Sequence, residues 1–222
     1  MTTEPARRQA STPAEAWALL EAGNERFVAG SSERPHQDLE RRAATAAGQA
    51  PFATVFGCMD SRVAAELVFD RGLGDLAVVR TAGHVLDNAV LGSLEFGHLG
   101  LGTPLIVVLG HDSCGAVKAT LAAAATGDLP GGHIRDVVER LTPTLISAQR
   151  DAATLDPDEL AVLHVQHTVR LLVERSPALA QAVSLGRLAV VGARYRLAEG
   201  RVRLLDVVGD IGLDGGTAAA SV

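Results

Sequence analysis

Two short segments hold the side chains most able to do chemistry, and they contain the only two cysteines among the 222 residues. Cys58 lies in residues 57–62 (GCMDSR), and His111 and Cys114 lie in residues 110–115 (GHDSCG). Two thiolates and one imidazole suit tetrahedral zinc, with the fourth position left for water or an acidic side chain. The two segments therefore predict one zinc site made of Cys58, His111 and Cys114.

The placement of these segments supports the same interpretation. Each follows an apolar run typical of a buried strand, residues 52–56 and residues 105–109. Open α/β sheets place ligand sites just past the carboxyl ends of strands, so we expect Cys58 and His111 there. A helix beginning directly after Cys114 would aim its N-terminal dipole at that sulfur. This position favours the thiolate that zinc binding requires.

Alternatives to a catalytic zinc stay open for these residues. The cysteines could be buried without a metal, or they could form a Cys58–Cys114 disulfide. A structural zinc would normally be closed by a fourth protein ligand, and there is no third cysteine to supply it. His164 and His167 share a helix face and could serve a metal, but surface or core packing is the expectation for them. We interpret His84 as a loop residue that could approach the site.

A Cys-x-Asp-Ser-Arg segment followed by a His-x-x-Cys segment, each leaving a strand, resembles the beta class of carbonic anhydrases. The likeness extends from about Gln49 to Lys118, and the flanking segments fit the usual layout of that family. It implies a zinc enzyme that converts carbon dioxide and water to bicarbonate and a proton by zinc-bound hydroxide. Two alternatives are a hydrolase of another heterocumulene, such as carbon disulfide, on the same scaffold, and a non-enzymatic zinc-binding protein.

Asp60 and Arg62 indicate why such a zinc would be catalytic. Residues two apart on an extended segment point the same way, so the two side chains can meet. A carboxylate paired with a guanidinium is held in its ionised state. Asp60 could then accept a hydrogen bond from zinc-bound hydroxide and orient its lone pair at carbon dioxide. The alternative is a surface ion pair without a catalytic role.

The resemblance also implies individual roles. It matches Cys58, His111 and Cys114 to the zinc ligands, and it matches Asp60 and Arg62 to the catalytic pair, with Asp60 as a possible fourth ligand in a closed state. The resemblance also implies two substrate-binding residues, which are neither zinc ligands nor members of the catalytic pair. Gln49 matches a glutamine that enters the substrate pocket across a dimer interface, and Gly115 matches a residue lining the pocket beside the metal. We therefore expect a homodimer or a homotetramer.

Three residues depart from the family pattern. Ala77 stands where many relatives carry phenylalanine, Phe96 where some carry tyrosine, and Ala82 where some carry valine. The departures concern the size of the pocket and its proton path, and they leave the zinc ligands intact.

Strands that alternate with helices predict an α/β fold with a mostly parallel sheet, about four parallel strands plus an antiparallel edge strand, flanked by helices. The strands are expected at residues 52–56, 76–79, 105–109, 188–191 and 202–208. Helices are expected at residues 38–47, 63–69, 87–99, 116–125, 134–141 and 159–174. The whole chain, residues 1–222, is expected to be a single domain.

The two ends of the chain lie outside this alternation. Residues 1–48 are expected to form an N-terminal helical arm. Its first helix is capped by Thr12 with Glu15 and ends at Gly30, and it could lie on its own sheet or on a neighbouring subunit. In the resembled family such helices reach across a dimer. Residues 211–222 are expected to be a loose tail.

Bulk composition excludes several classes of protein. A length of 222 residues with 47% hydrophobic content suits one domain with a sizeable core. The net charge of −6 argues against a nucleic-acid partner. No apolar run approaches the roughly 20 residues that span a bilayer, which argues against a membrane protein. Two cysteines and no visible secretory signal predict a cytoplasmic protein. The expected partner is a small molecule, carbon dioxide or bicarbonate.

Overall fold

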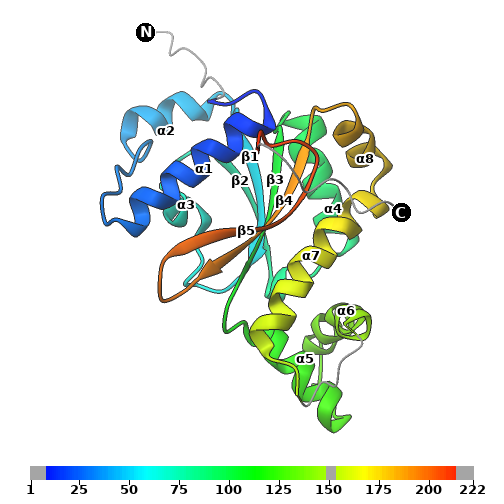
Figure 1. Cartoon of the computed structure of the whole chain (residues 1–222). Helices are drawn as coiled ribbons and strands as arrows, with labels where there is room; N and C mark the ends of the chain where they lie inside the picture. Colours follow the sequence, from blue (N-terminus) through cyan, green and yellow to red (C-terminus); the bar gives the residue numbers. More distant parts are fainter. Residues whose placement is uncertain (1–8, 149–153, 214–222) are drawn as a thin grey trace.

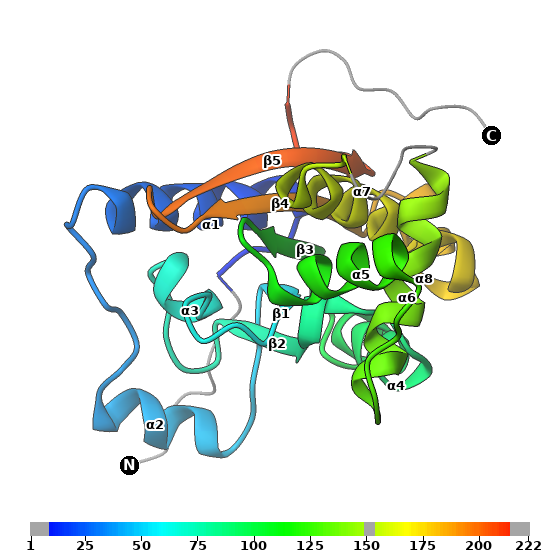
Figure 2. The same ribbon diagram turned by 90° about the horizontal axis from the view of Figure 1, so that it is seen from below.

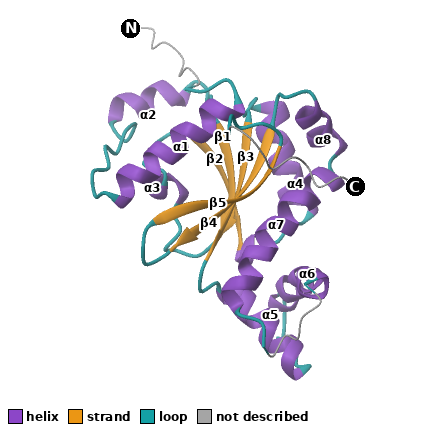
Figure 3. Cartoon of the chain, in the orientation of Figure 1, coloured by secondary structure: helices purple, strands orange, loops and turns teal. Residues whose placement is uncertain are grey.

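The structure is a computed structural model that describes residues 9–148 and 154–213. In these ranges the chain forms one five-stranded sheet with helices on both faces (Figures 1 and 3). The strands are β1 (Ala53–Cys58), β2 (Leu76–Thr81), β3 (Leu105–His111), β4 (Ala189–Arg196) and β5 (Arg201–Val208). Their order is β2-β1-β3-β4-β5, with four parallel strands and β5 antiparallel to β4 at the edge. The predicted sheet is confirmed.

Eight α-helices and two short helical turns lie before and between the strands in the described ranges. They are α1 (Pro13–Val28), α2 (Leu39–Ala46), α3 (Ala65–Val68), η1 (Ala82–His84), α4 (Asn88–Glu95), η2 (Phe96–Gly100), α5 (Gly115–Thr126), α6 (Ile134–Ser147), α7 (Pro157–Arg175) and α8 (Pro177–Ser184). The sequence pattern does not reveal α8, because a proline normally ends a helix. Here Pro177 stands at the first position of a new helix, and Ser176 caps it by accepting from the Leu179 N–H.

Strands β1 and β3 run further than the sequence predicts. Cys58 and His111 are the last residues of their strands and not the residues after them, because each still pairs with a neighbouring parallel strand. Cys58 stands opposite Thr81 of β2, and His111 stands opposite Tyr195 of β4. Since β1 and β3 are themselves paired, both side chains lie at the same carboxyl edge of the sheet.

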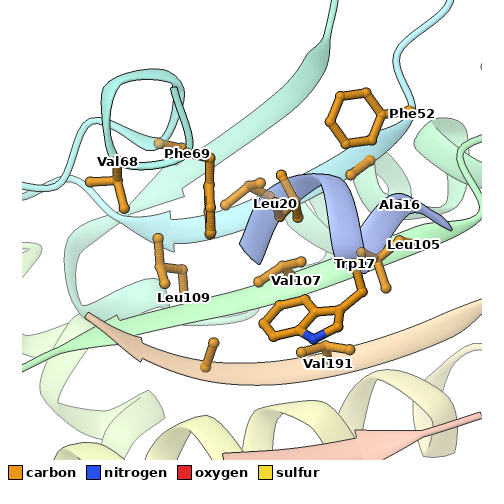
Figure 4. Close-up of a cluster of buried hydrophobic side chains, with 14 of the residues drawn as sticks. Ala16, Trp17, Leu20, Phe52, Val68, Phe69, Leu105, Val107, Leu109 and Val191 are labelled. Carbon is orange, nitrogen blue, oxygen red and sulfur yellow. The ribbon is translucent and has the colours of Figure 1, made fainter. Parts of the chain in front are cut away.

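Helices α1 and α3 cover one face of the sheet. Trp17 and Leu20 of α1 are buried against alternate strand residues such as Val107 and Val191 (Figure 4). The capping box at Thr12 is confirmed by the bonds in both directions. Of the two placements considered for the first helix, the structure has α1 on its own sheet. Helix α2, in contrast, buries none of its residues.

Helices α4, α7 and α8 cover the opposite face, and Figure 2 shows the strands between the two groups of helices. Helix α7 comes very close to the strands because Gly110 and Gly192 leave room for it. A Cβ at Gly110 would lie 2.4 Å from a Val165 methyl group, and one at Gly192 would lie 2.9 Å from the other Val165 methyl group. Helices α5 and α6 pack on each other and on α7, beside the carboxyl edge of the sheet.

Two expectations reach beyond the described ranges. Residues 1–8 of the arm and residues 214–222 of the tail lie outside the residues that the structure describes. Within the described part, no helix is both long and apolar enough to cross a membrane.

Mild acid should destabilise this fold, in part through His164. Burial in α7 lowers the pKa of His164 to about 4, whereas an unfolded chain titrates histidine near ~6.5. Between those values the unfolded chain binds a proton that the folded chain does not, so the free energy of unfolding falls as the pH drops. Between pH 7 and pH 5.5 the wild type should lose about 1 kcal/mol more than His164→Gln. Urea unfolding at both pH values measures this, and equal losses in the two proteins would contradict it.

Candidate metal centre

Three buried side chains meet at the carboxyl edge of the sheet. The ligand atoms of Cys58, His111 and Cys114 all lie within 4.8 Å of one another. Cys58 ends β1, His111 ends β3, and Cys114 is the residue that caps α5. Both cysteines are free, so the disulfide considered from the sequence is not formed. In the described ranges this is the one group of three such side chains close enough to hold a metal.

The hydrogen bonding of His111 leaves one ring nitrogen ready for a metal. Its Nδ1 lies 2.8 Å from the carbonyl oxygen of Asp112, which can only accept, so Nδ1 carries the hydrogen. The other nitrogen, Nε2, is buried and has no hydrogen-bond partner in the described structure. A buried lone pair beside two thiols is costly unless something coordinates it. A backbone carbonyl on the far nitrogen is also the usual support of a metal-bound histidine.

The two thiols form a coupled pair. The pKa of Cys58 is lowered to about 4, chiefly by a hydrogen bond from Cys114, and the backbone N–H groups of Asp60 and Gly83 assist. The same bond, together with burial, raises the pKa of Cys114. One thiolate therefore forms readily and the second is opposed by the first. A divalent cation between them removes that opposition, so two sulfurs and one nitrogen fit zinc.

Longer-range contacts hold the segments that carry the ligands. Arg80 of β2 donates from Nε to the Cys58 carbonyl oxygen at 2.9 Å and from Nη2 to the Asp60 carbonyl oxygen at 2.6 Å. Asp158, at the start of α7, accepts from the Ser113 N–H at 2.8 Å. Arg80 is absent from the residues predicted for the site. The only sequence signal for it is a basic residue in the neighbouring strand, and that signal is weak.

Asp60 and Arg62 form a two-pronged ion pair beside the ligands. The Arg62 backbone N–H and Nε each donate to Oδ1 at 2.9 Å, and Nη2 donates to Oδ2 at 2.6 Å. These bonds hold the pKa of Asp60 well below its usual range. Asp60 Oδ2 also lies 4.0 Å from Nε2 of His111. The Asp60 side chain is only 17% exposed, unlike the carboxylate of an ordinary surface pair.

Of the two expected substrate-binding residues, Gly115 lies next to the ligands and Gln49 lies far from them. Gly115 opens α5 directly after Cys114, and a Cβ added there would meet no atom of another element within 4 Å, so the space in front of Gly115 is open. Gln49 is exposed and precedes β1, whereas Cys58 ends β1. The two therefore lie at opposite ends of one strand, and a single chain does not bring Gln49 to the ligands.

The other histidines singled out from the sequence do not join the ligands. His84 is not a simple loop residue, because it is buried in η1 with its ring 4.4 Å from that of His164. His164 is buried as well, whereas His167 is half-buried on the same helix, so both follow the packing expected for them. The burial of His84 depends on α7, which lies far away in the sequence.

The matching family model and the similar proteins all belong to one family. The model of the carbonic anhydrase family matches residues 53–202, which include all three ligand residues. Carbonic anhydrase 2 of Mycobacterium tuberculosis is 54% identical over 202 residues, covering 91% of this chain and 97% of that protein. The carbonic anhydrase of Mycolicibacterium smegmatis is 56% identical, with 91% and 98% covered. The solved structure of a Coccomyxa beta-carbonic anhydrase is 26% identical and covers 86% of this chain and 87% of that chain, with a TM-score of 0.67.

Removing one thiol should remove the metal. Purified wild-type protein should contain about one zinc ion per chain, and Cys114→Ser should lose most of it, because a hydroxyl is a poor substitute for a soft thiolate. Ser113→Ala, in the same loop, is the matched control and should keep its zinc. Elemental analysis after dialysis measures all three proteins. A wild-type protein that stays metal-free even after zinc loading would contradict the assignment of these three residues as zinc ligands.

Proposed function

The chain belongs to the carbonic anhydrase family, in its beta class, and from this membership we propose which residues carry out the reaction. It is a zinc-dependent lyase that reversibly hydrates carbon dioxide to bicarbonate and a proton. Its relatives lend no support to carbon disulfide hydrolysis or to a non-enzymatic role. The observation that carries our proposal is the Asp60–Arg62 pair, which stands beside three buried ligand side chains.

We assign the zinc to Cys58, His111 and Cys114. When bound, zinc supplies a water molecule whose pKa falls from 15.7 towards ~7. The chain shields the three ligand side chains from solvent, because all three are buried. It leaves the side of Asp60 and Gly115 open, which gives a small apolar substrate room to approach.

Asp60 is the group that we place beside the nucleophile. Because Arg62 keeps it ionised, its carboxylate can only accept hydrogen bonds. With zinc bound, Asp60 would accept a hydrogen bond from the oxygen that the metal supplies and would so orient that oxygen towards carbon dioxide. Arg62 acts through Asp60: its three hydrogen bonds keep the carboxylate from turning onto the metal as a fourth ligand.

Gln49 we place in the active site of a second copy of the chain. Helix α2 leads to Gln49 and lies beside the edge strand β2, where Arg41 donates to the Leu73 carbonyl oxygen at 2.8 Å. The same side exposes apolar side chains, with Leu39 71%, Leu67 57% and Leu73 46% exposed. A hollow of about 510 Å³ lies between Leu67 and Leu73. A second copy would cover this side, which supports a homodimer or a homotetramer.

The extent and the location of the protein complete the proposal. The family model matches residues 53–202, and we extend the same domain to residues 1–222, with residues 1–48 as its helical arm. The packing of α1 on the sheet supports this extension. Two free thiols suit a reducing compartment, which supports a cytoplasmic location.

Arg62→Ala should lower activity steeply while zinc content stays near that of the wild type. Without the two hydrogen bonds from the guanidinium, Asp60 is held only by the backbone N–H of residue 62 and can turn onto the metal, since a carboxylate is a good zinc ligand at about 2.0–2.2 Å. Asp60→Asn should also be nearly inactive. Arg135→Ala, which breaks an exposed pair with Glu139 on α6, is the matched control and should be fully active. Stopped-flow hydration and elemental analysis at pH 6 and pH 8.5 test this. Near-wild-type turnover of Arg62→Ala at pH 8.5 would show that Asp60 and Arg62 form an ion pair without a catalytic role.

The placement of Gln49 can be tested by mixing two impaired proteins. Gln49→Ala should lose activity but keep its zinc, and Cys114→Ser should lose its zinc. In a mixed dimer, one site combines intact ligands with an intact glutamine from the other chain. Equal mixing with subunit exchange should therefore restore about a quarter of the sites of the wild type, as expected for a two-fold interface. Mixed dimers that form, as judged by differently tagged chains, without a gain in activity would contradict the placement.

A further inference from the structure

We propose that His164 is a positioning residue for the metal centre: it fixes the η1 turn so that the backbone N–H of Gly83 donates a hydrogen bond to the sulfur of Cys58. The inference rests on the proposed function, in which Cys58 is a zinc ligand. It extends the site from the ligand loops to α6 and α7, which supply none of the ligands.

The η1 turn has an unusual backbone. Gly83 has a φ of +61° and donates its N–H to Cys58 Sγ at 3.3 Å. A Cβ at this glycine would lie 2.7 Å from the Cβ of Ala116 and 3.2 Å from a methyl group of Leu141, so only glycine fits between the ligand and the two helices. The next residue, His84, also has a positive φ of 42°, which is unfavourable for a residue with a side chain. Gly83 adopts its positive φ at no cost, but the conformation of His84 needs support from outside the turn.

His164 supplies that support from α7. Its Nε2 lies 3.0 Å from the Gly83 carbonyl oxygen, and because a carbonyl only accepts, Nε2 carries the hydrogen. Its Nδ1 then has a free lone pair and accepts a hydrogen bond from the Thr144 hydroxyl group at 3.0 Å. Both side chains are buried, and burial lowers the pKa of His164, which keeps the ring neutral in this arrangement. A chain of hydrogen bonds thus runs from Thr144 through His164 and Gly83 to Cys58.

A comparison with His84 separates this role from simple packing. The two rings stack at 4.4 Å and both are buried. Yet neither ring nitrogen of His84 has a hydrogen-bond partner in the described structure, whereas both nitrogens of His164 do. An apolar ring could fill the space of His84. It could not replace the donor at Nε2 of His164, so His164 is the member of the pair connected to the metal centre.

The hydrogen bond to sulfur has a chemical consequence. An N–H that points at a thiolate draws charge from the sulfur, and less of that charge then reaches a bound metal. Partners beyond the ligands orient them and tune the metal in this way. If the turn loosens, Cys58 is less well oriented, so metal affinity should fall. Its sulfur also donates more charge to the metal, so the alkaline rise of the reaction rate should move to higher pH.

The test uses two replacements of nearly equal shape. His164→Gln keeps a donor within reach of the Gly83 carbonyl oxygen, and His164→Met does not. His164→Met should raise the zinc dissociation constant about 10-fold to 100-fold, and it should shift the pH–rate profile upward, whereas His164→Gln should stay near the wild type. His167→Gln, one turn along the same helix, is the control. Chelator competition gives the affinity, and the thiolate-to-metal absorption band of the cobalt-substituted proteins reports the sulfur directly.

The outcomes can be told apart. Equal zinc affinity, absorption band and pH profile for His164→Met and His164→Gln would overturn the inference. If His164→Met does not fold, Thr144→Val takes its place: it removes only the hydroxyl group that holds Nδ1, and an unchanged zinc affinity would again overturn the inference. A wild type that binds no zinc would instead refute the metal assignment on which the inference depends.

Discussion

The parallel pairing of β1 with β3 is the constraint on which the metal centre depends. It places the last residues of two neighbouring strands, Cys58 and His111, at one edge of the sheet. The third ligand, Cys114, follows as soon as the chain turns from β3 into α5. Thiols and a free imidazole nitrogen gathered in a dry place are unfavourable without a cation. The packing of the sheet therefore creates the site, and the zinc relieves the cost of burying it.

The surroundings of the site change from dry to wet across a short distance. On the α6 and α7 side, His84 and His164 are buried and neutral, because burial lowers the pKa of each. On the other side, Asp60 stays ionised beside a half-exposed Arg62. The dry side orients the ligands through backbone hydrogen bonds, and the wet side presents a fixed charge to the substrate. A small neutral molecule that becomes an anion suits such a boundary.

Local patterns account for most of the secondary structure, and neighbouring elements account for the differences. The apolar runs predict all five strands, both β1, β3 and β4, which are largely buried, and the edge strands β2 and β5, which are only partly buried. Their ends depend on pairing, so β1 and β3 extend to include Cys58 and His111. Helix α8 escapes prediction because a helix that starts with a proline directly after another helix resembles a break in the chain.

The order of residues along the chain is enough to specify the chemistry of this protein: which side chains could bind zinc, which carboxylate could assist, and that both stand at strand ends. Short spacing carries that information. The folded chain is needed to specify which nitrogen of His111 is free, that Arg80 holds the Cys58 segment, and that Gln49 lies at the far end of β1. The contact from His164 to Gly83 joins residues 81 positions apart, and no local pattern predicts which distant helix will pack against a turn.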